Sequence, residues 1–420
     1  MVMFGTCSFP AMRRRFARLV LLAMLLFSAS AVAQENTPEA LTISRADRLK
    51  VFEEVWEAVN KHFFDPNFNG VNWAQVREQY RPQAEAAPNK TQLNETLQKM
   101  LNELRSSHLT MTVHVKFKKQ TVEQELARKV SRRESLTFDA GMKYVRIDGK
   151  WVVSSVAEGS GAHSAGVQRG WALTHWNGES SGNDAPFTCE LNQQVTARFL
   201  DWQGQEKQLA LACKLYTDTG SPVERVTQTL ADGTVCLRFD NFSPGTESWL
   251  IGQVAQARNA PALVLDLRNN HGGNLSVLEK CFAPFFSEPR VFGAYHERNG
   301  KQLPLKAKGQ GKDAYRGRVV VLIDEKTASA AEIFAAGLQE AKRAVIVGRQ
   351  SSGDVLGSLN YKLSHGFYVD IPIWDYQTAN GARLEGRGVI PNEVVTLTLK
   401  DFLANRDLDI LRAQESLLKP

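Results

Sequence analysis

The sequence predicts an α/β protein with a helical N-terminal part and an all-β unit inserted before the α/β core. Three observations predict this arrangement. Apolar residues recur at helical spacing within residues 40–120, short strand-like runs fill residues 135–216, and buried apolar strands alternate with helices from residue 223 onward. With 43% hydrophobic residues in 420, the chain has enough apolar side chains for more than one core.

The first 33 residues have the pattern of a secretory signal peptide. Four arginines between residues 13 and 18 precede the apolar run 19–27, and small residues end in Ala31-Val32-Ala33. We expect cleavage before Gln34 and delivery to the periplasm or the medium; the alternative is an uncleaved membrane anchor, for which the run is short. Removing these residues lowers the formal net charge from +6 to +2, because they carry four arginines and no acid. With that charge and no clustered basic face, we expect no nucleic-acid partner. We expect no stable membrane anchor, because the apolar run is short.

Two amphipathic helices are expected in the N-terminal domain, residues 40–120. Their apolar residues recur over 49–63 and over 93–104, and the second helix stops at Arg105-Ser106-Ser107-His108. The charged stretch 116–134 has weak apolar periodicity and indicates a linker or a short solvated helix.

The all-β unit, residues 135–216, has strand candidates at 151–156, 195–200 and 208–212. Four cysteines follow the expected cleavage site, and four cysteines allow three pairings in an oxidising compartment. We expect Cys189–Cys213, because both lie in the β unit, which leaves Cys236–Cys281 as the other pair. None has metal-ligand spacing, so no metal or cofactor is implied.

The core, residues 223–400, contains nearly continuous apolar strands at 262–267, 319–324 and 344–348, each typical of a buried parallel strand. Helices are expected between them, and residues 401–420 form a C-terminal helix.

A strand-to-helix junction carries the most informative polar side chain of the core. The segment Asp324-Glu325-Lys326-Thr327-Ala328-Ser329-Ala330 leads from a buried strand into a helix. A Ser329 hydroxyl there would lie beside free N–H groups and the positive end of the helix dipole, which suit a developing oxyanion. The alternative is that Thr327 or Ser329 merely caps the helix.

A second turn follows the strand 262–267 and contains Gly272 and Gly273. Glycines let a backbone approach a substrate closely, and their N–H groups can hold an oxyanion. The alternative is a plain strand-to-helix turn.

Together these segments resemble C-terminal processing (tail-specific) serine proteases. Residues 265–273 resemble the family's DLRxNxGG signature, and 327–333 resemble its SASASEI segment, which places the nucleophile at Ser329. The resemblance implies a crotonase-like α/β protease core and covers most of residues 90–400. It implies an oxyanion hole made by the N–H of Ala330 and that of Gly272 or Gly273.

One departure selects a branch of the family. The Lys of the tail-specific Ser–Lys dyad is replaced by Asp354, and a carboxylate cannot act as a desolvated lysine. The tricorn-like branch instead uses a Ser-His pair and a Glu, and the segments around Ser107-His108 and Glu385 resemble its motifs. The resemblance makes His108 the general base, oriented by Ser107, with Glu385 completing the relay; imidazole suits this task.

The β unit resembles a PDZ domain in part, through Ser164–Val167 and Trp176-Asn177-Gly178. The resemblance places a peptide-binding loop at Gly141 and Met142, whose amides would hold a peptide end such as a C-terminus. The alternative is a degenerate domain that only packs on the core.

The resulting expectation is an exported serine endopeptidase (a hydrolase) that acts on proteins or peptides through an acyl-enzyme at Ser329. The rival is a non-catalytic peptide- or ligand-binding protein on the same scaffold, because a fold does not fix a function. A third possibility, a chaperone-like adaptor, would bind peptides without turnover.

Overall fold

A computed structural model describes residues 42–114, 138–181, 189, 193–215, 225–404 and 406–419. The expected signal peptide, its cleavage site before Gln34, and the linker 116–134 lie outside these residues. No helix in the described part is long and apolar enough to span a membrane.

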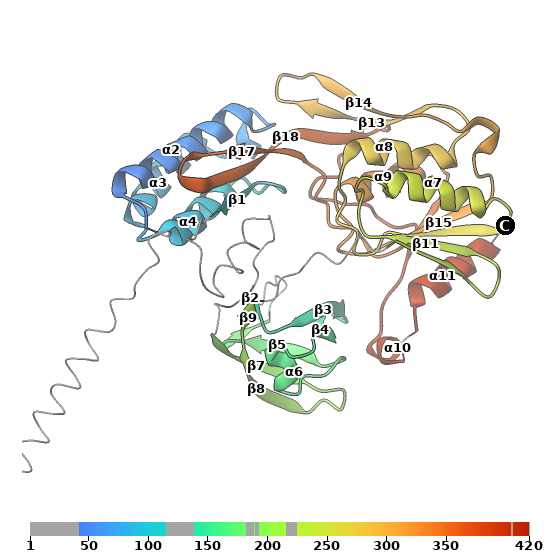
Figure 1. The fold of residues 1–420 in the computed structure, drawn as a ribbon, viewed down its shortest axis with the longest axis horizontal. Coiled ribbons are helices and arrows are strands. Elements are labelled where there is room, and N and C mark those ends of the chain that lie inside the picture. The colour runs from blue at the N-terminus through green and yellow to red at the C-terminus, as the bar shows by residue number, and fades with distance from the viewer. Residues whose placement is uncertain are drawn as a thin grey trace, which may run out of the picture.

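Three helices form the N-terminal part, where the sequence had predicted two: α2 (Arg45–His62), α3 (Trp73–Ala86) and α4 (Lys90–Asn102) (Figure 1). The extra helix, α3, buries only Trp73, Val76, Tyr80 and Ala84 and contains a proline, so its apolar periodicity is faint. The side chains of Ser44, Asn72 and Asn89 accept backbone hydrogen bonds at the three N-termini, which explains where each helix begins.

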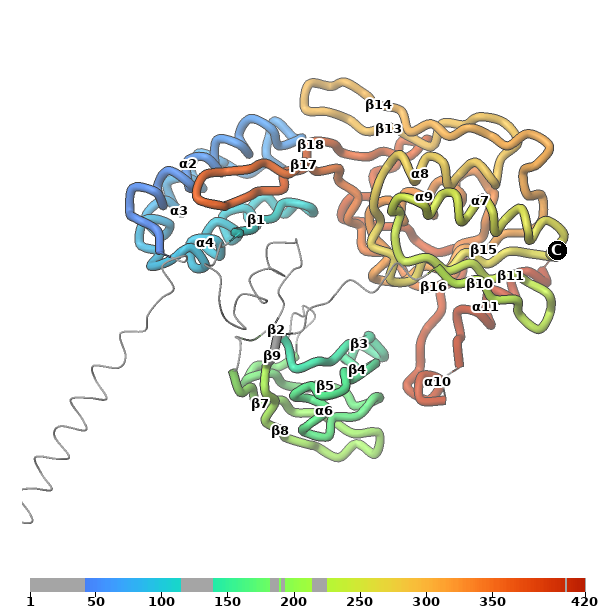
Figure 2. The backbone as a smooth tube through the Cα atoms, viewed as in Figure 1, coloured from blue at the N-terminus to red at the C-terminus, as the bar shows by residue number. Residues whose placement is uncertain are grey.

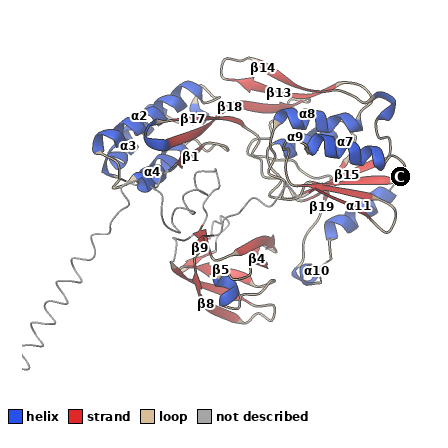
Figure 3. Cartoon of the chain, viewed as in Figure 1, coloured by secondary structure: helices blue, strands red, loops and turns tan. Residues whose placement is uncertain are grey.

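The all-β unit forms one antiparallel sheet in the order β3-β4-β5-β7-β8, with β6 paired to β5 (Figure 3). Alternate residues of β7 are buried, and Phe199 and Leu211 are central to its core. A short helix, α6, packs near β8, and β2 pairs with β9. The bounds are β2 (Phe138–Asp139), β3 (Met142–Ile147), β4 (Lys150–Val156), α6 (Gly161–Ser164), β5 (Ala172–Trp176), β6 (Glu179–Ser180), β7 (Gln194–Leu200), β8 (Glu206–Ala212) and β9 (Lys214–Leu215).

The core contains a second sheet, in the order β10-β11-β12-β15-β16-β19, that is parallel except for β10. The helices α7, α8 and α9 cover one face and α11 the other (Figure 1). The predicted α/β class is therefore confirmed. The bounds are β10 (Arg225–Thr229), β11 (Val235–Phe239), α7 (Thr246–Gln256), β12 (Ala262–Asp266), α8 (Leu275–Phe282), β15 (Arg318–Ile323), α9 (Ala330–Glu340), β16 (Val345–Gly348), β19 (Glu393–Val394), α10 (Leu399–Leu403) and α11 (Leu408–Leu418).

Helix α11 is held to the sheet by ion pairs at the end of β12. Arg268 donates to Asp266 at 2.7 Å and to Asp407, the N-cap of α11, at 2.8 Å. Asp409 accepts from both Arg268 and Arg349. These partners raise the pKa of the Arg268 guanidinium, despite the opposing effect of burial. Arg268 of the DLRxNxGG-like segment therefore serves to attach α11.

A third sheet joins the N-terminal helices to the core. Its 12-residue strand β18 (Phe367–Thr378) pairs at one end with β1 (Thr110–Val113) and β17 (Gly357–Lys362). At the other end β18 pairs with β13 (Arg290–Glu297), which pairs in turn with β14 (Gln302–Ala307). Figure 2 shows β18 running from the helical part to the core. Because His108 lies just before β1, this pairing fixes it relative to the core.

The cysteine pairs expected from the sequence are half confirmed. Cys189 and Cys213 form a disulfide with their Cα atoms 6.3 Å apart. The expected pair Cys236–Cys281 is wrong, and both thiols are free and buried. Cys236 belongs to the cluster under α11, whereas Cys281, on α8, belongs to the cluster on the opposite face. The central sheet therefore separates the two sulfur atoms.

We predict two free thiols in the denatured, unreduced chain from residue 34 onward, and four after reduction. In the native protein both should react slowly with a thiol reagent, because burial raises the pKa of Cys236 to about 12 and also raises that of Cys281. Reaction with a chromogenic disulfide measures the thiol count before reduction, the thiol count after reduction, and the rate in the native protein. Zero thiols without reductant would mean that the sheet does not separate Cys236 from Cys281.

Candidate active site

Three polar segments singled out in the core, those around Gly272, Ser329 and Asp354, follow the carboxyl ends of parallel strands. Strands β12, β15 and β16 are adjacent and parallel, so their ends meet at one edge of the sheet. The turns that follow them are residues 267–274, 324–329 and 349–355. This edge is where ligand sites of open α/β sheets are usually found.

Ser329 occupies the N-cap position of α9 with φ 56° and ψ −125°. A non-glycine residue with positive φ is uncommon and is held there only by its surroundings. Thr327, the other capping candidate, is buried, and its hydroxyl lies 2.9 Å from the carbonyl oxygen of Leu267. Thr327 therefore ties the Ser329 turn to the neighbouring strand end.

The glycine turn lies directly against the Ser329 turn. A Cβ added to Gly272, whose φ is +88°, would lie 2.6 Å from the Cβ of Ser329 and 2.7 Å from the nitrogen of Ala330. The buried Asn270 joins the two turns, because its carbonyl oxygen accepts from Ala328 N–H at 2.9 Å. Only glycine fits at position 272 without moving the nucleophile turn.

Two of the three N–H groups expected to form an oxyanion hole are available. The N–H of Gly272 donates to the Asn270 side chain at 2.9 Å, so it is already engaged. In the part of the chain that the structure describes, the N–H groups of Gly273 and Ala330 have no protein acceptor. Gly273 and Ala330 are therefore the donors that a substrate oxygen could use.

A buried carboxylate that the sequence analysis did not assign holds the Ser329 turn. Glu332 accepts from Ser329 N–H at 3.0 Å and from Asp354 N–H at 2.9 Å on one oxygen. Its other oxygen accepts from Ser351 Oγ at 2.6 Å and from Gly353 N–H at 2.7 Å. The contact between Glu332 and the Ser329 N–H could have been predicted from the sequence, because Ser329 and Glu332 have the spacing of a capping box.

The surroundings of Glu332 act on its titration in opposite directions. Burial is the larger effect and raises the pKa of the carboxyl, while the four donated hydrogen bonds lower it. A carboxylate that accepts four hydrogen bonds is a rigid connection between α9 and the loop 351–354.

The three residues of the expected relay lie together. Ser107 Oγ is 3.0 Å from His108 Nδ1 and 3.0 Å from Glu385 Oε2. The N–H of Ser107 also donates to Glu385, at 3.1 Å. Glu385 comes from the segment after β18, so it lies 278 positions from Ser107 in the sequence and yet contacts it here.

This arrangement selects a proton position on the histidine. A carboxylate only accepts, so the Ser107 hydroxyl donates its one proton to Glu385. The same oxygen then accepts from Nδ1–H of His108, which leaves the lone pair on Nε2. The network therefore assigns the tautomer that a general base requires.

The loop where a dyad lysine would lie connects Glu332, which holds the Ser329 turn, to the Ser107–His108–Glu385 cluster. Asp354 N–H donates to Glu332, and the next N–H, that of Val355, donates to Glu385 at 3.0 Å. Within the described residues no hydrogen bond joins Ser329 to His108. Catalytic hydrogen bonds are often long in free enzymes and shorten when substrate binds.

The expected peptide-binding loop of the β unit is partly engaged. The N–H of Gly141 donates to Asp139 at 2.6 Å, and the carbonyl oxygen of Gly141 accepts from Ala157. Met142 is the first residue of β3 and is buried. A peptide end bound at this loop would have to displace the Asp139 carboxylate from Gly141.

No group of metal-ligating side chains is present among the described residues.

Comparison with known proteins gives two family matches in this chain. The model of peptidase family S41 matches residues 233–395, which contain Ser329, Glu332 and Glu385. The model of the tricorn protease C1 domain matches residues 44–102, the helices that precede His108.

Relatives match along nearly the whole chain. A carboxyl-terminal-processing protease of Synechocystis is 25% identical over 415 residues, covering 93% of this chain and 90% of the relative. Among solved structures, a photosystem II D1 C-terminal processing protease has a TM-score of 0.56 and 23% identity, covering 84% of this chain and 94% of that one. Mature CPAF complexed with lactacystin has a TM-score of 0.69 and 12% identity, covering 89% and 98%. These two structures show the shared fold. From the matched family models and the relatives, residues 233–395 are a peptidase family S41 domain and the chain is a serine-type peptidase.

Proposed function

We propose that the chain is an exported serine endopeptidase that hydrolyses peptide bonds through an acyl-enzyme at Ser329, with His108 as general base. The observation that carries the proposal is the Ser107–His108–Glu385 cluster, which leaves Nε2 of His108 able to accept a proton. The position of a dyad lysine is held by Asp354, so His108 is the base that the chain offers.

In the first step Ser329 Oγ attacks the substrate carbonyl carbon while Nε2 of His108 takes the hydroxyl proton. The imidazolium charge is balanced through Ser107 by Glu385. His108 then returns the proton to the leaving amine, and a water molecule, deprotonated by the same nitrogen, hydrolyses the acyl-enzyme.

The oxyanion of the tetrahedral intermediate would be held by Gly273 and Ala330. Both N–H groups are free of protein acceptors in the described residues, and Ala330 begins α9, where the helix dipole favours negative charge. Glu332 fixes the position of Ser329 through its backbone N–H.

The remaining assignments are proposals supported by sequence patterns. Residues 1–33 would be a signal peptide removed before Gln34, which makes the enzyme periplasmic or secreted. Residues 40–120 would be the helical domain, 135–216 a PDZ-like domain that binds substrate ends, 223–400 the protease core and 401–420 a C-terminal helical segment. The substrates would be proteins or peptides, since the relatives are named as processing proteases.

Replacing Ser329 by Ala should abolish peptide hydrolysis and labelling by a fluorophosphonate probe while leaving the protein folded. The reason is that the probe and the substrate carbonyl both need the Ser329 oxygen. Casein hydrolysis and probe labelling measure the two effects, with Ser352→Ala as the control because Ser352 is an exposed serine in the same region. Wild-type hydrolysis by the Ser329→Ala protein would refute the nucleophile. A folded wild-type protein that binds peptides but neither cleaves them nor takes up the probe would favour the binding-protein alternative.

Replacing His108 by Ala should lower kcat by roughly three orders of magnitude or more, as loss of a general base does. Glu385→Gln should have a smaller effect, because the amide keeps the shape and one acceptor of the carboxylate. Steady-state kinetics on a quenched peptide measure kcat and KM separately.

His296→Ala is the matched control for the histidine change, because His296 lies on β13, which pairs with the end of β18 opposite to the one that pairs with β1. An added lysine, Asp354→Lys, should not raise the rate, since the base is already in place. Unchanged kcat in His108→Ala, or a gain in Asp354→Lys, would argue that the base is not histidine.

A further inference from the structure

A cavity lies at the edge of the central sheet opposite the turns that contain Ser329 and Gly272. Its volume is about 670 Å³, which is within the range of small-molecule sites. It is formed where β15 and β16 begin and where α9 and α11 end. Because Ser329 lies at the other end of β15 and α9, this cavity is separate from the catalytic site.

The lining of the cavity is strongly basic. Five cationic residues line it, and Glu393 is the single acidic residue there. Glu393 is already neutralised, because it accepts from Lys419 at 2.6 Å and pairs with Arg412 at 2.6 Å. The five cationic residues are Arg316, Arg318, Lys342, Arg343 and Lys419.

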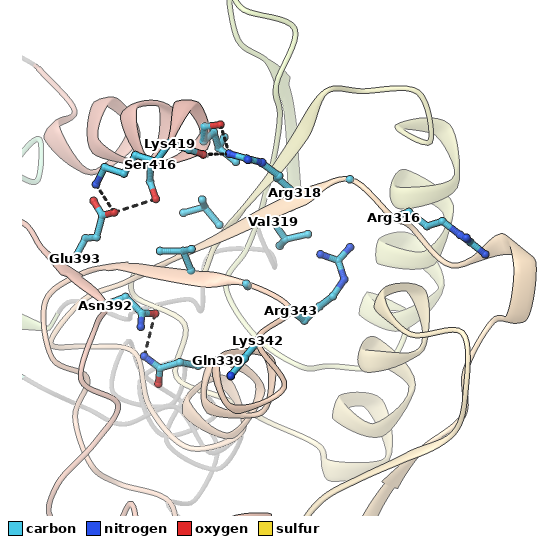
Figure 4. Close-up of a pocket in the computed structure, with 15 residues that line it drawn as sticks. Arg316, Arg318, Val319, Gln339, Lys342, Arg343, Asn392, Glu393, Ser416 and Lys419 are labelled. Atoms are coloured by element: carbon cyan, nitrogen blue, oxygen red, sulfur yellow. Dashed lines mark hydrogen bonds and ion pairs between the residues drawn. The ribbon is translucent and has the colours of Figure 1, made fainter.

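Arg343 is the central cation of this lining. Figure 4 shows its guanidinium in the middle of the cavity, whereas Arg318 extends toward the end of α11. Arg343 donates to the carbonyl oxygens of Phe285, at 3.0 Å, and Tyr315, at 2.7 Å, which are neutral partners. In the described residues no carboxylate is within ion-pair distance of Arg316, Arg318, Lys342 or Arg343.

Only some of the cationic side chains that line the cavity have a structural role in the fold. Arg318 donates to the carbonyl oxygens of Leu417 and Lys419 and so caps the end of α11. Lys342 and Arg316 are exposed, and their side chains make no hydrogen bond or ion pair among the described residues. A partly buried guanidinium without a counter-charge is unfavourable, and burial lowers the pKa of Arg343. An anion in the cavity would supply the missing charge.

We propose that this cavity binds a small organic or inorganic anion that carries at least two phosphate or carboxylate groups. A single negative charge would leave most of the cationic lining unbalanced, and Arg343 retains guanidinium N–H groups for a planar or tetrahedral oxyanion.

The test is isothermal titration of the purified protein with inorganic pyrophosphate and, separately, with citrate, at constant ionic strength. We expect saturable binding of one anion per chain for at least one of the two, and a higher Tm in its presence. Binding of pyrophosphate alone would identify phosphate as the preferred group, and binding of citrate alone would identify carboxylate.

Lys342→Ala should weaken binding about 2- to 5-fold, which is the loss of one exposed charge contact, and Arg343→Gln should weaken it more. Lys306→Ala is the matched control, because it removes an exposed lysine on β14, outside the cavity. If Arg343→Gln fails to fold, Lys342→Ala decides the question. Heats no larger than those of chloride at the same ionic strength, or equal weakening by Lys342→Ala and Lys306→Ala, would overturn the proposal.

Discussion

The hydrogen bonds accepted by the buried carboxylate of Glu332 are the constraint on which the site depends. They fix the N–H of Ser329 on one side and the loop 351–354 on the other. The next residue of that loop, Val355, donates to Glu385, which in turn holds Ser107. Glu332, a single buried acid, thus connects Ser329 through the loop to the Ser107–His108–Glu385 cluster, although no hydrogen bond joins Ser329 to His108 among the described residues.

The architecture brings these elements together through the long strand β18. One end of β18 pairs with β1, directly after His108, and the other pairs with β13 on the core. Glu385 follows β18 by a few residues, so the same strand delivers both ends of the Ser107–Glu385 contact. The helical part therefore supplies Ser107 and His108 to this cluster, in addition to packing against the core.

Much of the fold and of the candidate site could be predicted from the sequence, because strong local sequence patterns indicate them. Buried strands ending in polar turns predicted the α/β core, and the motifs around Ser329, His108 and Glu385 predicted the cluster that the structure shows for Ser107, His108 and Glu385. The failures concern tertiary placement. The pattern cannot show that a sheet separates Cys236 from Cys281, that Asn270 occupies the Gly272 N–H, or that Glu332 accepts from a loop some twenty residues away. Each of these depends on which segments meet in space.

The most direct test is the rate at which a fluorophosphonate labels Ser329 in Glu332→Gln, with Glu340→Gln, at the other end of α9, as control. An amide in place of the carboxylate puts an NH2 group against two N–H or O–H donors, which breaks two of the four hydrogen bonds at about 1–3 kcal/mol each. The account predicts a labelling rate at least ~10-fold lower in a folded Glu332→Gln protein, and a wild-type rate in Glu340→Gln. Wild-type labelling in folded Glu332→Gln would contradict the claim that this carboxylate holds the nucleophile in place.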